Sequence, residues 1–71
     1  MRVYFGFYPL PEAEYTAVMV TDDADCLPPN LLKLTSRDLD EDTAESFAEM
    51  FQRNGFAVTY QVGDTFWELD V

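Results

Sequence analysis

Residues 40–71 read DEDTAESFAEMFQRNGFAVTYQVGDTFWELDV, and this stretch decides the fold. In its first half, residues of one apolar stripe recur at helical spacing: Ala44, Phe47, Met50 and Phe51, with Asn54 continuing the stripe. Carboxylates crowd the first turns, where the helix dipole favours negative charge. Asn54-Gly55 is a typical helix stop, which Phe56 can complete with an apolar contact. The pattern therefore predicts a helix over residues 41–54.

Two acidic pairs are candidate caps for the start of this helix. Asp42 with Glu45 three residues later resembles a capping box. Asp40 with Thr43 is a weaker version of the same pattern. The first pair is therefore the expected cap.

The second half of the stretch predicts a β-hairpin. Alternate residues are apolar or β-branched on both sides of Gly63-Asp64: Phe56, Val58, Tyr60 and Val62 before it, and Thr65, Trp67, Leu69 and Val71 after it. A two-residue type II′ turn with Gly63 at its first central position places Tyr60 opposite Trp67, so the two faces coincide. The expected core is Phe47, Phe51, Val58, Tyr60, Trp67 and Leu69.

Two further strands are expected before the helix. Val3, Phe5 and Phe7 alternate with other residues until Pro9 ends the strand, and residues 15–21 are rich in β-branched side chains. A link of about six residues favours an antiparallel pair. Residues 22–36 lose this period, and we expect a loop whose Leu31, Leu32 and Leu34 fold back on the core, with a short extended piece as an alternative.

Together these elements predict an α+β fold. The expected order is ββ-loop-α-ββ, with one helix across a small antiparallel sheet. A chain of 71 residues allows one domain, residues 1–71, and 48% hydrophobic residues indicate a globular protein.

No apolar stretch approaches the length of a membrane span. The apolar opening stops at Pro9 without a cleavage signal. An unpaired cysteine favours a reducing compartment, so the expected location is cytoplasmic, without membrane contact.

The composition argues against catalysis. The chain has no histidine, which is the commonest general base and metal ligand, and it has a single cysteine. Cys26 lies between Asp25 and Leu27, without a neighbour that would activate a thiolate. A calcium loop counted from Asp22 fails, because Lys33 stands where the bidentate acid belongs. The sequence therefore predicts no enzyme activity, no cofactor and no metal.

Acidic residues carry the main functional signal. Fourteen Asp and Glu against four Lys and Arg give a net charge of −10. On a helix, four of them form a ridge: Asp38, Asp42 (or Glu41), Glu45 and Glu49. Neighbouring carboxylates on such a ridge lie roughly 5–6 Å apart, comparable to successive phosphates of a nucleic acid. The ridge is either a binding surface for a basic groove or a solvated, capping helix face. The loop acids Asp22, Asp23 and Asp25 are a candidate second contact.

Aromatic residues give a second signal. If Val3 and its alternates face the core, Tyr4 and Tyr8 face away from it, and Phe66 lies on the face opposite to Trp67. Aromatic side chains on an exposed sheet face are candidate interface anchors. The alternative is that the loop around residues 31–34 covers them.

As a whole profile, a short, strongly acidic α+β chain resembles the small inhibitors that phages use against host nucleases, including anti-CRISPR proteins and DNA mimics. The resemblance implies an inhibitor that binds a basic nucleic-acid-binding protein or a CRISPR effector complex, without catalysis and without binding nucleic acid itself. Two alternatives stay open. One is an immunity protein or antitoxin for a basic nuclease, and the other is a small structural or accessory subunit that uses the aromatic sheet face. The sequence also leaves a homodimer open.

Overall fold

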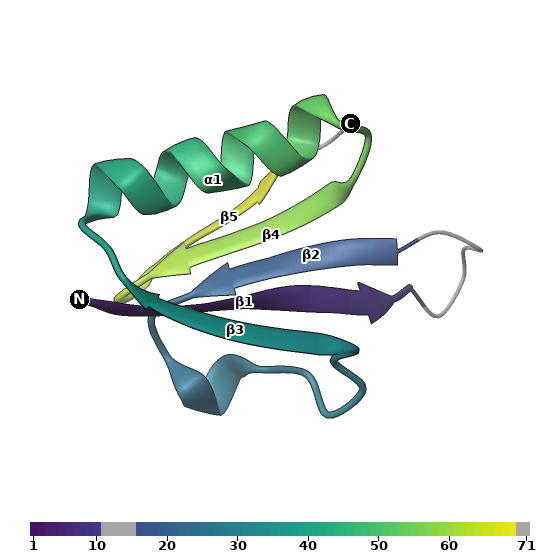
Figure 1. The fold of residues 1–71 in the computed structure, drawn as a ribbon, viewed down its shortest axis with the longest axis horizontal. Helices are drawn as coiled ribbons and strands as arrows, with labels where there is room; N and C mark the ends of the chain where they lie inside the picture. The colour runs from purple at the N-terminus through teal and green to yellow at the C-terminus, as the bar shows by residue number, and fades with distance from the viewer. Residues whose placement is uncertain (11–15, 70–71) are drawn as a thin grey trace.

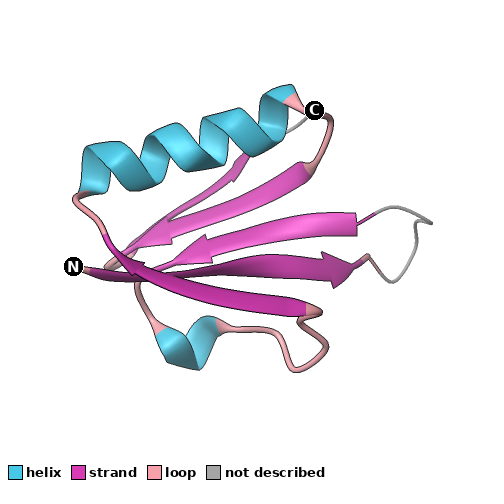
Figure 2. Cartoon of the chain, viewed as in Figure 1, coloured by secondary structure: helices cyan, strands magenta, loops and turns pink. Residues whose placement is uncertain are grey.

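The computed structural model describes residues 1–10 and 16–69, and it confirms the α+β class. The described elements are β1 (Arg2–Pro9), β2 (Thr16–Thr21), the short 3-10 helix η1 (Ala24–Cys26), β3 (Lys33–Asp38), α1 (Glu41–Arg53), β4 (Ala57–Val62) and β5 (Thr65–Leu69). The strands form one sheet in the order β3-β1-β2-β4-β5. Helix α1 crosses one face of this sheet, and the segment that contains η1 lies on the other side (Figures 1 and 2).

The sheet is mixed, whereas the sequence predicts an antiparallel one. β1 pairs with β2 in the expected antiparallel way, but β2 pairs with β4 in parallel, with Val18 beside Val58. The reason is that β3 and α1 lie between β2 and β4 in the chain. The helix returns the chain across the sheet before β4 starts, and such a crossover connection gives a parallel pair.

Strand β3 occupies part of the expected loop. Its sequence, KLTSRD, has no clear apolar face, so periodicity alone gave little sign of a strand. The segment is a strand because it pairs with its neighbour: β3 pairs antiparallel with β1, which places Thr35 beside Phe5. Before β3, Leu31 lies against Gly6, where an added Cβ atom would come within 2.9 Å of the Leu31 Cγ atom and closer still to the Lys33 carbonyl oxygen. Glycine at position 6 thus permits the close approach of this segment.

Helix α1 begins at the predicted residue but uses the other cap. The Asp40 carboxylate accepts a hydrogen bond from the backbone N–H of Thr43 at 2.8 Å, so Asp40 is the N-cap and the capping box expected on Asp42 is wrong. The helix ends at Arg53, and Gly55 has the left-handed φ of 91° that the stop signal predicts.

The core lies between α1 and the middle of the sheet. Its buried residues are Val3, Val18, Val20, Ala44, Ala48, Val58 and Tyr60. An aromatic cluster packs beside it, in which Phe47 stacks on Phe5 and Phe51 meets Phe7 edge to face. This cluster fixes one flank of α1 over β1.

The C-terminal hairpin has the predicted register. Tyr60 lies opposite Trp67, and their rings stack with centroids 4.9 Å apart. Gly63 has a φ of 57°, as its predicted place in the turn requires. Of the expected core, Val58 and Tyr60 are buried, and Phe47, Phe51 and Leu69 are half-buried.

Trp67 is the exception to the expected core, because its side chain is 38% exposed. The physical reason is that β5 is the outer strand, whereas α1 packs mainly on β4 and β2 and leaves β5 partly uncovered. The predictions for Tyr15 and Val71 lie outside the described residues.

Candidate functional site

The topology gathers acidic residues at one end of the molecule. β2, β3 and β4 run in the same direction, and α1 begins at the edge where these strands end (Figure 1). Acidic residues stand within two residues of each of these strand ends and in the first turn of the helix: Asp22, Asp38, Asp40, Glu41, Asp42 and Asp64. We refer to these six residues as the acidic end.

The acidic end continues along one side of α1. Ala44 and Ala48 face the sheet, while Phe47 and Phe51 lie toward β1. At about 100° per residue, the opposite flank of the helix, toward β5, carries the acids spaced by three or four positions. We call this exposed row the acidic flank: Glu41, Asp42, Glu45 and Glu49.

Several of these carboxylates act on the buried side chain of Tyr60. Its hydroxyl donates a hydrogen bond to the Glu41 carbonyl oxygen at 3.3 Å. Burial is the largest cause that raises the pKa of Tyr60 to about 12, and the negative charges of Glu45, Glu41, Asp22 and Asp42 contribute to the same rise in that order. The end of β2 and the acidic flank therefore act on one phenol with the same sign of charge.

Asp38 does not join the predicted ridge. It is the last residue of β3, and its carboxylate lies 3.5 Å from the Arg2 guanidinium. Strand pairing with β1 keeps Asp38 in the sheet, and the helix starts three residues later. The row on the helix therefore begins with Glu41 and Asp42, the pair between which the sequence pattern did not choose.

Two of the loop acids accept hydrogen bonds from backbone N–H groups of this chain. The Asp22 carboxylate accepts hydrogen bonds from the Gly63 N–H at 3.0 and 3.1 Å, and so ties the end of β2 to the β4–β5 turn. Asp23 caps η1 by accepting from the Asp25 N–H at 2.9 Å. Asp25 is exposed. The predicted second contact is thus divided: Asp22 belongs to the acidic end, whereas Asp23 and Asp25 belong to the η1 segment.

Cys26 lies beside acidic groups that disfavour its thiolate form. The side chain is exposed, and its Sγ atom donates to the Asp23 carboxylate at 3.5 Å. Partial desolvation, this hydrogen bond and the charges of Asp23 and Asp25 raise the pKa of the Cys26 thiol above its usual value. These contacts disfavour the thiolate, as the neighbouring acids in the sequence indicate.

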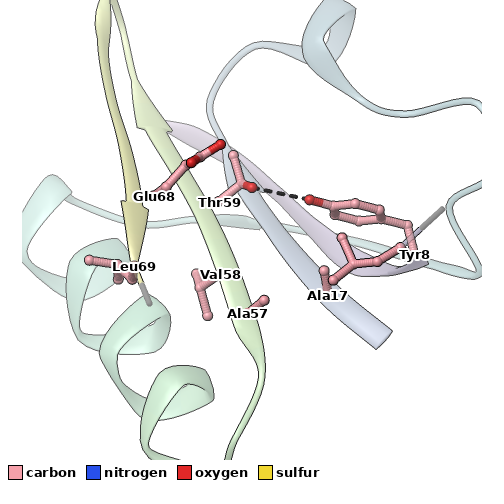
Figure 3. Close-up of a pocket in the computed structure, with 8 residues that line it drawn as sticks. Tyr8, Ala17, Ala57, Val58, Thr59, Glu68 and Leu69 are labelled. Carbon is pink, nitrogen blue, oxygen red and sulfur yellow. Dashed lines mark hydrogen bonds between the residues drawn. The ribbon is translucent and has the colours of Figure 1, made fainter. Parts of the chain in front are cut away.

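The aromatic residues occupy the sheet face opposite α1, as expected from their alternation. Tyr4 and Tyr8 are half-buried there, and the Tyr8 hydroxyl is hydrogen-bonded to Thr59 Oγ1 at 3.1 Å, beside a pocket of about 210 Å³ (Figure 3). Phe66 is 54% exposed and borders a shallow hollow of about 340 Å³. Pro28 lines the same hollow, so the covering segment starts well before residue 31.

Sequence reasoning missed Trp67 as a surface residue. Its alternation with Tyr60 indicates the shared face correctly, but only the strand order shows that this face is open at β5. The signal that was available is the composition of β5 itself, which combines two large aromatic residues with few charges in a terminal strand.

In residues 1–10 and 16–69, no group of three or more Cys, Asp or Glu side chains is placed to hold a metal ion. The described helices include none that is long and apolar enough to cross a membrane.

Comparisons of the chain with protein-family models, with curated proteins and with solved structures found no match.

Proposed function

We propose that this protein is a non-catalytic inhibitor that binds the basic, nucleic-acid-binding surface of a partner protein. The acidic flank of α1 is the observation that carries the proposal. Helix α1 has four carboxylates along its length, and its one basic residue, Arg53, is its last. A partner groove lined with Lys and Arg, such as that of a host nuclease complex, matches this charge.

The helix gives the row the rigidity that a phosphate mimic needs. Ala44 and Ala48 are fully buried and fix the rotation of α1 on the sheet. The carboxylates next to them therefore keep a spacing of roughly 5–6 Å without the flexibility of a loop. Because their positions are preset, binding to a row of basic residues costs less ordering of this surface.

The alternatives differ in the surface that they use. An immunity protein or antitoxin for a basic nuclease would bind through the same acidic flank, and the identity of the partner distinguishes it. A structural or accessory subunit would use the aromatic face instead, and the 54% exposure of Phe66 favours that second candidate. Its binding would not respond to a change of charge on α1.

The proposal is tested by identifying the partner and titrating it. Tagged protein captures the partner from a host lysate, mass spectrometry identifies it, and the purified pair is titrated at low and high salt. The variant Glu45→Lys/Glu49→Lys should bind on the order of a hundredfold more weakly, because two charge-assisted contacts become repulsive. Wild-type affinity should fall as salt rises, and nucleic acid should compete for the site.

A matched variant separates the acidic flank from overall charge. Asp25→Lys/Asp38→Lys raises the net charge by the same four units, but these residues lie in η1 and at the end of β3. This control should keep most of the affinity, because neither residue belongs to the acidic flank and the Asp38 carboxylate already lies 3.5 Å from the Arg2 guanidinium. Equal losses in the two double variants would mean that only total charge matters, and full binding by the α1 variant would overturn the proposal.

A further inference from the structure

Among the described residues, no strand pairs with the outer edge of β5. β5 is the outer strand of the sheet, and Thr65, Phe66, Trp67 and Glu68 are all exposed. The opposite edge strand, β3, carries Lys33, Arg37 and Asp38, and such charges are a common way to discourage edge pairing. Among its five residues, β5 has one charged side chain and two large aromatic ones.

The hairpin register shows which backbone groups of β5 are free to pair. In a two-residue hairpin, the residues that flank the turn exchange both backbone hydrogen bonds, and bonded and non-bonded pairs then alternate. Thr65, Trp67 and Leu69 therefore bond to β4. The N–H and C=O groups of Phe66 and Glu68 point outward, away from the described strands.

The two faces beside this edge differ in chemistry. On the face of α1, the exposed Trp67 ring stacks on Tyr60, whose hydroxyl reaches the first residue of the acidic flank. On the other face, Phe66 borders the hollow of about 340 Å³ together with Met19. An added strand would therefore meet an indole and carboxylates on one face, and an apolar hollow on the other.

On the basis of the proposed function, we infer that an extended basic segment of the partner protein pairs with the open edge of β5. Its cationic side chains lie over Trp67 beside the acidic flank, and its alternate, apolar side chains enter the hollow at Phe66. Arginine suits the first position, because its guanidinium stacks on an indole while carboxylates accept its N–H groups. Strand addition of this kind takes affinity from backbone hydrogen bonds and specificity from alternate side chains.

Charge complementarity favours this occupant over a second copy of the chain. Two copies that paired through β5 would bring together proteins of net charge −10 each. An antiparallel pair centred on Trp67 would also leave both acidic flanks close to the joint, without added cations. A basic segment neutralises this charge, whereas self-pairing concentrates it.

The test uses two capped hexapeptides of the same composition. One alternates arginine and valine, and its isomer has the arginines in one block and the valines in the other. Fluorescence of Trp67, the one tryptophan of the chain, reports binding to wild-type protein at low salt. The alternating peptide should bind on the order of tenfold more tightly, because only its side chains match both faces. It should also slow amide hydrogen exchange at Phe66 and Glu68.

A pair of variants isolates the backbone contact. Glu68→Pro removes an outward N–H, whereas Glu68→Gln removes the charge and keeps that N–H. The proline variant should bind the alternating peptide on the order of tenfold more weakly than the glutamine variant. The exchange measurement on wild-type protein decides the question if the proline variant does not fold.

Several outcomes would overturn the inference. They are equal binding of the two peptides, unchanged exchange at Phe66 and Glu68, or a protein dimer in sedimentation whose β5 amides are already protected. The proposed function has a separate readout. If Glu45→Lys/Glu49→Lys loses the partner but the peptides bind equally, that function stands and strand pairing is wrong. If the alternating peptide is preferred but charge reversal leaves partner binding intact, the proposed function is the one that fails.

Discussion

At the scale of single residues, Tyr60 connects the core to the charged surface. The residue is 3% exposed, it stacks on Trp67, and its hydroxyl reaches the backbone of α1 at Glu41. The phenol must stay neutral in this position, because burial removes water and the nearby carboxylates repel a phenolate. Ionisation of this one side chain would therefore cost the fold stability.

Raising the pH should therefore destabilise the protein through Tyr60. The pKa of Tyr60 is about 12 in the folded protein, against about 10 for an unfolded tyrosine. The stabilisation is fully present below pH 10 and is lost as the pH rises toward 12, because the unfolded chain ionises first. The loss amounts to about 2–3 kcal/mol of unfolding free energy.

Urea unfolding at stepped pH values measures this loss. Tyr60→Phe provides the control, because phenylalanine keeps the ring and has no group to ionise. The unfolding free energy of wild type should fall relative to that of the variant as the pH rises from 10 to 12. A constant difference from pH 9 to pH 12 would contradict the assignment.

At the scale of elements, the packing of α1 on β1 depends on Phe51. This side chain meets Phe7 edge to face at 5.8 Å and Phe56 at 6.1 Å, but it is only half-buried. Phe51→Ala should therefore cost about 2–3 kcal/mol of unfolding free energy, below the range for a fully buried phenylalanine. Met50 is the matched control on the same helical turn, because it is more exposed, and Met50→Ala should change stability by less than about 0.5 kcal/mol. Equal effects in urea unfolding would show that the aromatic cluster does not hold the helix.

The elements that sequence reasoning predicted well are those fixed by local signals. The helix start at Glu41, the stop at Gly55 and the turn at Gly63 depend on neighbours a few residues away, and the structure confirms each of them. The apolar stripe is confirmed only in part, because Met50 and Asn54 are exposed. β3 depends on β1 instead, since residues 33–38 have no apolar face of their own. The capping box expected on Asp42 is a local prediction that was wrong, because the Asp40 carboxylate is the one that accepts from the Thr43 N–H.

At the scale of the whole molecule, strand order decided what the sequence could not. The acids of the helix were predicted as a row, and α1 presents them as one. Asp22 lies at the same end as these acids because β2 and β4 are parallel neighbours in the sheet. This pairing joins segments that are far apart in the sequence. The exposure of Trp67 has the same origin, because it follows from the edge position of β5. Sequence therefore predicted which residues carry the charge, and it predicted Phe66 as exposed, but it predicted neither the exposure of Trp67 nor how these residues are brought together.

The net charge of −10 should make salt act in opposite directions on folding and on binding. The molecule measures 32 × 25 × 20 Å, and the screening length falls from about 30 Å at 0.01 M salt to about 3 Å at 1 M. At low salt each carboxylate is thus repelled by all the others, and at high salt only by its neighbours. Raising NaCl over this range should stabilise the fold by about 1 kcal/mol. The same salt should weaken attraction to a basic partner.

Thermal unfolding at several NaCl concentrations, run beside the partner titration, tests this opposition. Glu45→Lys/Glu49→Lys removes two like-charge contacts on the helix, so this variant should be more stable than wild type at low salt and should gain less from NaCl. Asp25→Lys/Asp38→Lys changes the total charge equally, but it removes the Asp38 contact with Arg2 and should gain less stability at low salt. If wild-type stability stays constant or falls as NaCl rises, repulsion among the carboxylates does not destabilise the fold. If stability rises while partner affinity falls, the same carboxylates that strain the free protein are those that a basic partner neutralises.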